Sequence, residues 1–444
     1  MAEQAISAPP RTLGSSATEL LRELIRINTV NPPGNERELQ ERLQGMLSEV
    51  GFECQLLESA PKRANLVARL RGRSDGPTLT YLGHVDTVRA DSEEWTQDPW
   101  SGELADGEIW GRGALDMKGQ VAAEVAAALE LARGGWRPGA GDLLLVIVAD
   151  EETGGDLGAR WLCEQHPELV RSDYVVNEGG GGAFELDGRR LYTICVGEKG
   201  ILRFKIRTHG VAGHAAVPKI GENALLKLAP LISRLSEQPP LEPRPEGLLF
   251  LSVALREEVG ADGIEAAVGR LRASQPLIAD YLTEPMLGVT VNPTRVWGSE
   301  KANVVPSVAE VLVDCRVPPG MSRGEVRERV DSLLGDDGYE LEFTEQAAAN
   351  SSPVDSPLAD AIRSWLAEAD PGAELAPIVM PGFSDSNWFR AAFDSATVYG
   401  FCPHRHRGLL EAAPLVHGAD ERVPVEDLEL AARFFYELAP RMLG

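Results

Sequence analysis

The sequence predicts an α/β protein in which a small α+β domain interrupts a larger one. Nearly all-apolar runs at 64–70, 78–88 and 142–152 indicate buried strands. They alternate with helical patterns such as that at 121–132, which is typical of a central sheet with helices on both faces. After residue 197 the strands alternate polar and apolar residues and are interleaved with helices in β-α-β-β-α-β order. From about residue 350 the first pattern returns and the chain ends in a helix.

The domain boundaries follow from this change of pattern. We expect a larger domain made of two segments, 1–196 and 350–444, with an inserted domain over 197–349 between them. A length of 444 residues exceeds what one hydrophobic core usually supports, which agrees with two domains. Within the inserted domain, the stretch 237–284 is long and its pattern predicts an additional helix or helix pair.

Composition excludes several classes of partner. The formal net charge is -25, with 68 acidic against 43 basic residues, so nucleic acid and anionic membranes would be repelled. Five scattered cysteines indicate neither a disulfide framework nor a cysteine-type zinc site and fit a reducing compartment. We find neither a signal-peptide pattern nor an apolar run of about 18 residues. We therefore expect a soluble, cytoplasmic protein.

His84 lies at the end of an apolar strand, in GHVDT, with Asp86 two positions later. Residues two apart share one face of a strand, so the Asp86 carboxylate could orient the His84 ring, as carboxylates do for metal-bound histidines. A strand-end histidine held by a hydrogen bond is the alternative.

Asp116 lies in GRGALDMKG, between glycines that allow a sharp turn close to a ligand. A phosphate loop is disfavoured because the spacing differs from a Walker sequence and no Lys-Ser/Thr pair follows. Asp116 could instead cap the helix that begins near Lys118.

Three consecutive acids follow the apolar strand LLLVIVADEETGG, and they form the most informative cluster. Open α/β sheets bind ligands beyond the carboxyl ends of their strands, and adjacent residues leave a strand in different directions. Glu152 can therefore bind a metal while Glu151 faces a water molecule; an exposed acidic turn is the alternative. Glu178 in VVNEGGGG and His417 in LVHGADERVP offer further ligands. Carboxylates with imidazoles suit zinc, cobalt or manganese better than calcium.

Ten motifs in order along the chain resemble the superfamily of zinc-dependent aminoacylases, glutamate carboxypeptidases, acetylornithine deacetylases and succinyl-diaminopimelate desuccinylases. The motifs are PPGNE, GHVDTV, GRGALDMKG, VADEETGG, NEGG, GVAGHAAVP, NVVP, VDCRVPPG, GFSDSNWF and HGADERV. The resemblance covers nearly the whole chain. It implies an amide or peptide hydrolase with two divalent metal ions, by default zinc, and an inserted lid domain that also forms a homodimer.

The resemblance also assigns roles to the metal-site residues. His84 and Glu178 would bind one metal, Glu152 and His417 the other, and Asp116 both. Glu151 would be the general base that takes a proton from a bridging water and passes it to the leaving nitrogen. Asp86 would support His84, and the peptide bond Asp116–Met117 would be cis.

Residues outside the metal site receive roles in the same way. His214 would reach across the dimer to stabilise the oxyanion; a loop histidine without a role is the alternative. Asn303 and Arg316 would bind a substrate carboxylate, although Arg316 could instead form an ion pair within the lid. Ser384 and Asp385 would line the substrate pocket, with helix capping near Asn387 as the alternative for Asp385.

These roles leave several functions open. A dipeptidase or carboxypeptidase, an N-acyl-amino-acid deacylase and a desuccinylase all fit a small carboxylate-bearing substrate. An inactive metal-binding relative is disfavoured because Glu151 and all the inferred ligands are present, and a nucleotide-binding protein is disfavoured by the lack of its motifs. The stretch 237–284 could cover or extend the surface that the dimer uses.

Overall fold

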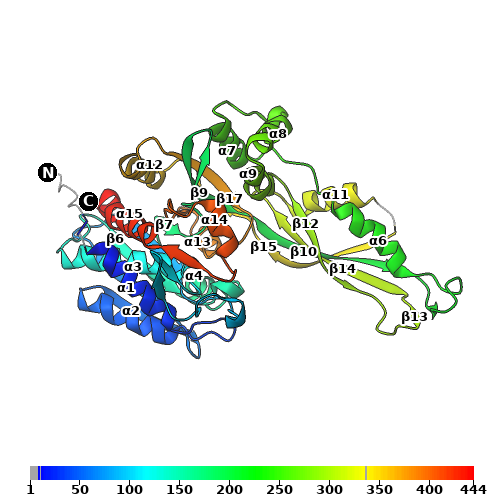
Figure 1. The fold of residues 1–444 in the computed structure, drawn as a ribbon, viewed down its shortest axis with the longest axis horizontal. Helices are drawn as coiled ribbons and strands as arrows, with labels where there is room; N and C mark the ends of the chain where they lie inside the picture. The colour runs from blue at the N-terminus through cyan, green and yellow to red at the C-terminus, as the bar shows by residue number, and fades with distance from the viewer. Residues whose placement is uncertain (1–8, 11, 336–337) are drawn as a thin grey trace. The chain divides into compact units, whose positions relative to one another are not determined.

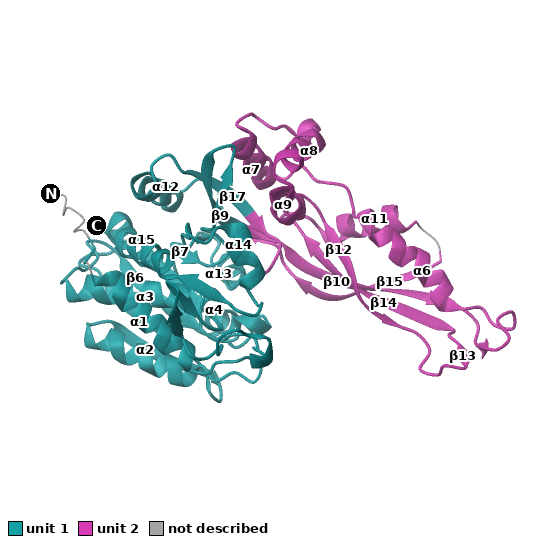
Figure 2. Cartoon of the chain, in the orientation of Figure 1, with its two compact units in different colours: residues 1–196, 352–378, 384–444 teal, residues 197–351, 379–383 magenta. Residues whose placement is uncertain are grey.

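The computed structural model describes residues 9–10, 12–335 and 338–444 (Figure 1). The chain forms two compact units (Figure 2). Unit 1 comprises Met1–Val196, Ser352–Ile378 and Ser384–Gly444, and unit 2 comprises Gly197–Ser351 and Val379–Phe383. None of the helices in the described part of the chain combines the length and the apolar run needed to cross a lipid bilayer.

Unit 1 is built on a mixed sheet. Along the path β1-β2-β6-β3-β7-β18-β9, strand β3 is parallel to β6 and β7, and β18 is parallel to β7, whereas β1, β2 and β6 pair antiparallel. Strands β8 and β17 also pair with β9. The bounds are β1 Glu53–Ala60, β2 Arg63–Arg71, β3 Thr78–His84, β6 Asp142–Val148, β7 Tyr174–Asn177, β8 Ala183–Leu186, β9 Arg189–Glu198, β17 Glu374–Met380 and β18 Thr397–Gly400. A small sheet, β19-β5-β4, joins Arg422–Pro424, Glu108–Trp110 and Glu103–Ala105.

Helices cover both faces of this sheet, because alternate strand residues point to opposite sides. On β6, Leu143, Leu145 and Ile147 pack in one core with α1, α2, α3, α12 and α15. The intervening Leu144, Val146 and Val148 pack in a second core with α4 and α13. The bounds are α1 Leu13–Arg26, α2 Arg37–Glu49, α3 Lys118–Arg133, α4 Ala159–Gln165, α12 Pro357–Ala369, α13 Ser386–Ala392 and α15 Val425–Leu443. The predicted α/β class, with a central sheet flanked by helices, is confirmed.

Unit 2 contains a four-stranded antiparallel sheet in the order β12-β14-β10-β15. One face of β10 carries Leu202, Phe204 and Ile206, which are buried together with residues of α6 and α11. The opposite face carries Arg203 and Arg207, which form ion pairs with acids of β14 and β15. The bounds are β10 Gly200–His209, α6 Ala224–Leu235, β12 Thr290–Trp297, β14 Val308–Val317, α11 Arg323–Leu334 and β15 Glu340–Ala347.

The stretch 237–284 adds helices between α6 and β12. They are α7 Pro245–Leu255, α8 Ile264–Ser274, α9 Pro276–Ile278, the π-helix η4 Ala279–Thr283 and α10 Glu284–Leu287. The prediction of additional helical structure here is confirmed. Buried apolar side chains such as Phe250, Leu251 and Leu271 lie within these helices.

We expect one buried acid of α3 to make the stability of unit 1 depend on pH. Glu124 is buried and accepts a hydrogen bond from Gln120 at 2.9 Å, while its second oxygen has no partner among the described residues. Burial raises the pKa of this carboxyl well above its ordinary value of 4.5. As the pH rises above 4.5, the unfolded chain loses this proton but the folded chain keeps it. The free energy of unfolding therefore falls, by up to about 1.4 kcal/mol per pH unit.

We expect Glu124→Gln to remove this loss, because glutamine keeps the shape and cannot ionise. The advantage in melting temperature of the variant over the wild type should be larger at pH 8 than at pH 5. The same substitution at Glu130, which pairs with Arg133 near the end of the same helix, is the control. An equal difference at both pH values would show that Glu124 is not a buried neutral acid.

Candidate metal centre

Three strands of the unit 1 sheet bring acids and a histidine to one edge. His84 is the last residue of β3, Glu151 and Glu152 lie in the turn that follows β6, and Glu178 follows β7. Since β3 is parallel to β6 and β7, these carboxyl ends lie at the same edge of the sheet, where α/β proteins bind ligands. Asp116 arrives from the loop before α3 in the same unit.

Asp116 lies between two histidines. Its Oδ1 is 3.0 Å from Nε2 of His84, and its Oδ2 is 3.1 Å from Nε2 of His417. His417 Nε2 is also 3.0 Å from Oε2 of Glu152. One carboxylate thus presents a separate oxygen to each histidine, so Asp116 could contribute a ligand to each of two ions.

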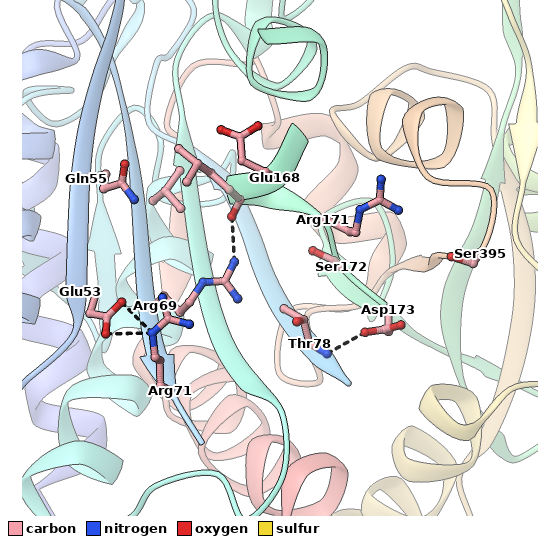
Figure 3. Close-up of a pocket in the computed structure, with 12 residues that line it drawn as sticks. Glu53, Gln55, Arg69, Arg71, Thr78, Glu168, Arg171, Ser172, Asp173 and Ser395 are labelled. Atoms are coloured by element: carbon pink, nitrogen blue, oxygen red, sulfur yellow. Dashed lines mark hydrogen bonds and ion pairs between the residues drawn. The ribbon is translucent and has the colours of Figure 1, made fainter. Parts of the chain in front are cut away.

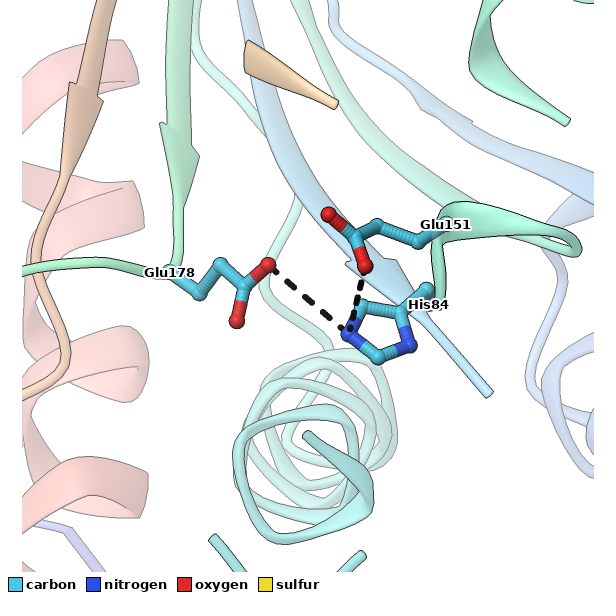
Figure 4. Close-up of side chains that lie close together, drawn as sticks. All are labelled: His84, Glu151 and Glu178. Atoms are coloured by element: carbon cyan, nitrogen blue, oxygen red, sulfur yellow. Dashed lines mark ion pairs between the residues drawn. The ribbon is translucent and has the colours of Figure 1, made fainter. Parts of the chain in front are cut away.

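Glu178 and Glu151 face the same ring nitrogen of His84 that Asp116 contacts (Figure 4). Their nearest oxygens are 3.7 Å and 3.9 Å from His84 Nε2. Two groups have ligand atoms that all lie within 4.8 Å of one another, His84 with Glu151 and Glu178, and His84 with Asp116 and Glu152. All six predicted metal-site residues therefore converge at this edge of unit 1.

The buried position of the cluster disfavours the ionised form of its carboxyl groups. Burial raises the pKa of Glu151 and of Glu178 well above the ordinary value, and neighbouring carboxylates add to the effect. Hydrogen bonds to Asp116 and Glu152 raise the pKa of His417 to about 10. Four carboxylates with two imidazoles match the ligand preferences of zinc, cobalt and manganese. The donor set therefore fits a pair of divalent cations, which would offset this charge.

Asp86 lies beside His84 and also contacts the two glutamates that follow β6. Nδ1 of His84 lies 3.0 Å from the backbone oxygen of Asp86 and 3.6 Å from its carboxylate. The backbone carbonyl is therefore the closer acceptor, which leaves Nε2 of His84 directed at Asp116. The Asp86 carboxylate also accepts the backbone N–H groups of Glu151 and Glu152, both at 3.2 Å.

Glu421 is a buried acid for which the sequence motifs predict no role. Its Oε1 accepts the backbone N–H groups of Leu115, at 2.7 Å, and Asp116, at 3.0 Å. Its Oε2 accepts Gly113 N–H at 3.0 Å and Arg112 Nη1 at 2.7 Å. Glu421, which lies four residues after His417 in the sequence, therefore fixes the loop that carries Asp116. In the sequence, Glu421 appears only as one of the charged residues of HGADERV, and surface loops often contain such residues.

The loop around Asp116 also settles two expectations. The peptide bond Asp116–Met117 is cis, as the resemblance implies. The alternative that Asp116 caps the following helix is wrong, because α3 begins at Lys118 after Met117 and has no side-chain cap.

Ser384 and Asp385 are both buried at the start of α13 in unit 1. Asn177, the last residue of β7, donates to Ser384 Oγ at 3.3 Å and to Ser386 Oγ at 2.9 Å. Asp385 occupies the N-cap position of α13, but its side chain makes no capping hydrogen bond there. Its charge is among the causes, after burial, that raise the pKa of Glu151.

His214, Asn303 and Arg316 belong to unit 2 and are not among the residues of the cluster. His214 and Asn303 are exposed and adjacent, since the N–H of Ala215 donates to the backbone oxygen of Asn303 at 3.0 Å. Arg316 donates to Asp314 at 2.7 Å, the ion pair that the sequence left open as an alternative.

A separate cavity of about 470 Å³ lies at the other edge of the unit 1 sheet (Figure 3). Its lining includes Glu53 and Thr78, the first residues of β1 and β3, and Arg71, the last residue of β2. None of the predicted site residues lines it. It is therefore distinct from the metal cluster.

Comparison with known proteins identifies the family. Residues 80–441 match the model of peptidase family M20/M25/M40. The chain belongs to this family. It is therefore a metal-dependent hydrolase, and the resemblance found in the sequence is confirmed.

Relatives within this peptidase family differ in the activity that their names give. The chain is 28% identical over 424 residues to a succinyl-diaminopimelate desuccinylase from Cereibacter sphaeroides, covering 92% of this chain and 94% of that protein. It is 26% identical over 378 residues to probable carboxypeptidase S-like 2 from Dictyostelium discoideum, covering 81% and 70%. A metallo-carboxypeptidase from Sulfolobus solfataricus has a similar fold, with a TM-score of 0.70, 19% identity and coverage of 96% and 98%.

Proposed function

We propose that the chain hydrolyses an amide or peptide bond in a small substrate that carries a carboxylate, with a pair of divalent metal ions and Glu151 as general base. The observation that supports this most directly is the placement of Asp116, with one oxygen at His84 and the other at His417. His84 and Glu178 would hold one ion, Glu152 and His417 the other, and Asp116 both. Zinc is the expected metal, and cobalt or manganese would accept the same ligands.

When bound, such a pair of ions lowers the pKa of a water molecule between them and polarises the scissile carbonyl. The chain supplies the proton transfer. Both oxygens of Glu152 are engaged, one with His417 at 3.0 Å and one with the N–H of Val88 at 3.2 Å. Glu151 accepts no hydrogen bond from the described residues, so its carboxylate can take a proton from the attacking water and deliver it to the leaving nitrogen.

The substrate class rests on the family and on unit 2. We favour a dipeptidase or carboxypeptidase, or an N-acyl-amino-acid deacylase, with a desuccinylase as the alternative because relatives bear that name. Ser384 and Asp385 are proposed to line the substrate pocket. Asn303 and Arg316 are proposed to bind the substrate carboxylate, and a bidentate arginine suits that role.

We further propose that unit 2 is the lid domain and that it forms a homodimer in which His214 serves the partner subunit's active site. Strand β12 is an edge strand of the unit 2 sheet, and its Val296 and Trp297 are exposed, as is Leu226 of α6. Exposed apolar side chains beside an open strand edge favour self-association. Sedimentation velocity tests this, and a monomer at all concentrations would contradict it.

Removal and return of metal tests the hydrolase proposal. Protein dialysed against a chelator should lose turnover of N-acyl amino acids, dipeptides and N-succinyl-diaminopimelate, and zinc, cobalt or manganese should restore it. The preferred substrate identifies the activity among the three candidates. Turnover that is insensitive to chelation, or absent on every amide after metal is restored, would refute the proposal.

A further inference from the structure

Asp150, which directly precedes Glu151 and Glu152, has an unusual backbone conformation. Asp150 lies between β6 and Glu151 with φ 73° and ψ 9°, in the left-handed region. A residue with a side chain adopts this region only where its surroundings hold it there. Because Asp150 directly precedes Glu151, two residues after the end of β6, its conformation sets the directions in which Glu151 and Glu152 leave the strand.

Four donors hold the Asp150 carboxylate, which is buried. Its Oδ1 accepts from Nη2 of Arg63 at 2.8 Å, Nδ2 of Asn31 at 3.1 Å and Oγ1 of Thr153 at 2.7 Å. Its Oδ2 accepts the backbone N–H of Leu157 at 2.9 Å. Arg63 supplies the only charged donor of the four.

A second acid anchors Arg63 itself. Nε of Arg63 donates to Oε2 of Glu36 at 2.8 Å, and its Nη2 donates to Oε1 at 2.9 Å. The side chain of Glu36 is fully buried, and that of Arg63 is 9% exposed. Two-pronged pairing of this kind fixes the plane of a guanidinium, which lysine cannot reproduce. Glu36 therefore fixes the guanidinium that holds Asp150.

The same hydrogen-bond network is also connected to the backbone of Glu151 and Glu152 through Asn31 and Asp86. Asn31 Nδ2, which contacts Asp150, also donates to Oδ2 of Asp86 at 2.9 Å. The Asp86 carboxylate accepts the N–H groups of Glu151 and Glu152. Among the described residues, Arg63 forms no hydrogen bond or ion pair with either of these glutamates, so it can act on them only through its neighbours.

We propose that Arg63 is a positioning residue that, anchored by Glu36, holds Asp150 in its left-handed conformation and so directs Glu151 and Glu152 toward the metal pair. This inference rests on the proposed function. Arg63 comes from the start of β2, where the sequence shows only a charge before an apolar strand. Partners beyond the direct ligands typically change metal affinity or activity by roughly 10–100-fold.

The test compares two arginines of the same strand. Arg69 of β2 pairs with Asp142, the first residue of β6, whereas Arg63 pairs with Asp150, two residues past the end of β6. Arg63→Met and Arg69→Met each remove one partly or fully buried arginine that bridges the same two strands. Metal-free protein is titrated with Co²⁺, and the visible absorption spectrum, the Co²⁺ affinity, kcat and KM are measured for each variant.

We expect Arg63→Met to lower kcat or Co²⁺ affinity by roughly 10–100-fold, with an altered Co²⁺ spectrum and a smaller change in KM. Arg69→Met should leave all of these within about twofold of the wild type, since it acts only on stability. Equal losses in both variants, or none in Arg63→Met, would overturn the proposal. Failure of the proposed function would show separately, as a wild type that binds no Co²⁺ or hydrolyses no amide.

Two further variants keep the test decisive if Arg63→Met does not fold. Arg63→Lys keeps the charge but not the two-pronged pairing, and a folded lysine variant with wild-type spectrum and kcat would also overturn the proposal. In the Asp150→Asn background, the effect of Arg63→Lys on kcat should shrink, because the arginine acts through Asp150. Full additivity would show that Arg63 acts by another route.

Discussion

Glu151→Gln should lower kcat by roughly 10²–10⁴-fold while the protein keeps its metal content and melting temperature. The amide has the size of the carboxylate but cannot accept a proton from the attacking water. The neighbouring ligands do not depend on it, since Asp116 and Glu152 contact the histidines through their own oxygens. Metal analysis and steady-state kinetics on the same preparation measure both quantities.

Glu178→Gln is the matched control for this prediction. It makes the same chemical change to the other glutamate beside His84, at 3.7 Å from Nε2 instead of 3.9 Å. Because Glu178 is a proposed metal ligand, Glu178→Gln should lower the metal content of the protein, whereas Glu151→Gln should leave it unchanged. If Glu151→Gln lost metal and Glu178→Gln kept it, the roles of the two residues would have to be exchanged. Wild-type turnover in Glu151→Gln would remove the general base from the mechanism.

Asp116→Asn should have the largest effect on metal binding. Its two oxygens lie 3.0 Å and 3.1 Å from the two histidines, so an amide at this position replaces one ligand oxygen by a group that cannot bind a cation. Because both ions would lose a shared ligand or its charge, the loss of affinity should exceed the roughly 10–100-fold typical of an outer partner. Activity should fall with metal occupancy and recover only in part when excess metal is added.

Metal titration of Asp116→Asn against Asp142→Asn checks this prediction. Asp142 is also an acid at an end of a strand of the same sheet, but it pairs with Arg69 at the opposite end of β6. The control should keep wild-type metal affinity. A variant at Asp116 that still bound a pair of ions with wild-type affinity would show that the aspartate does not bridge them.

The sequence predicted the class of fold and the converging side chains because both depend on local patterns. The apolar runs before His84, Glu151 and Glu178 identify strands whose carboxyl ends meet at one edge. Strand β1, in contrast, was not predicted, because Glu53–Ala60 mixes exposed and partly buried positions at the edge of the sheet.

The supporting residues could not be predicted in the same way. Arg63 contacts Asp150 from 87 positions away, and Glu421 contacts the Asp116 loop from more than 300 positions away. No local pattern distinguishes such single charges from surface charges, so only the folded structure identifies their partners. The placement of Asp86 shows a related limit: its shared strand face with His84 was predicted, but not that its backbone oxygen is the nearer acceptor.

Strand β18 lies inside the unit 1 sheet, between β7 and β9, although it is encoded after the whole of unit 2. During synthesis, β7 and β9 therefore lack β18, the strand that pairs with both of them, while more than 190 further residues emerge from the ribosome. All four strands of the unit 2 sheet, in contrast, are synthesised before β18. We expect unit 2 to acquire its structure first, and unit 1 to remain accessible to chaperones and proteases until translation is nearly finished.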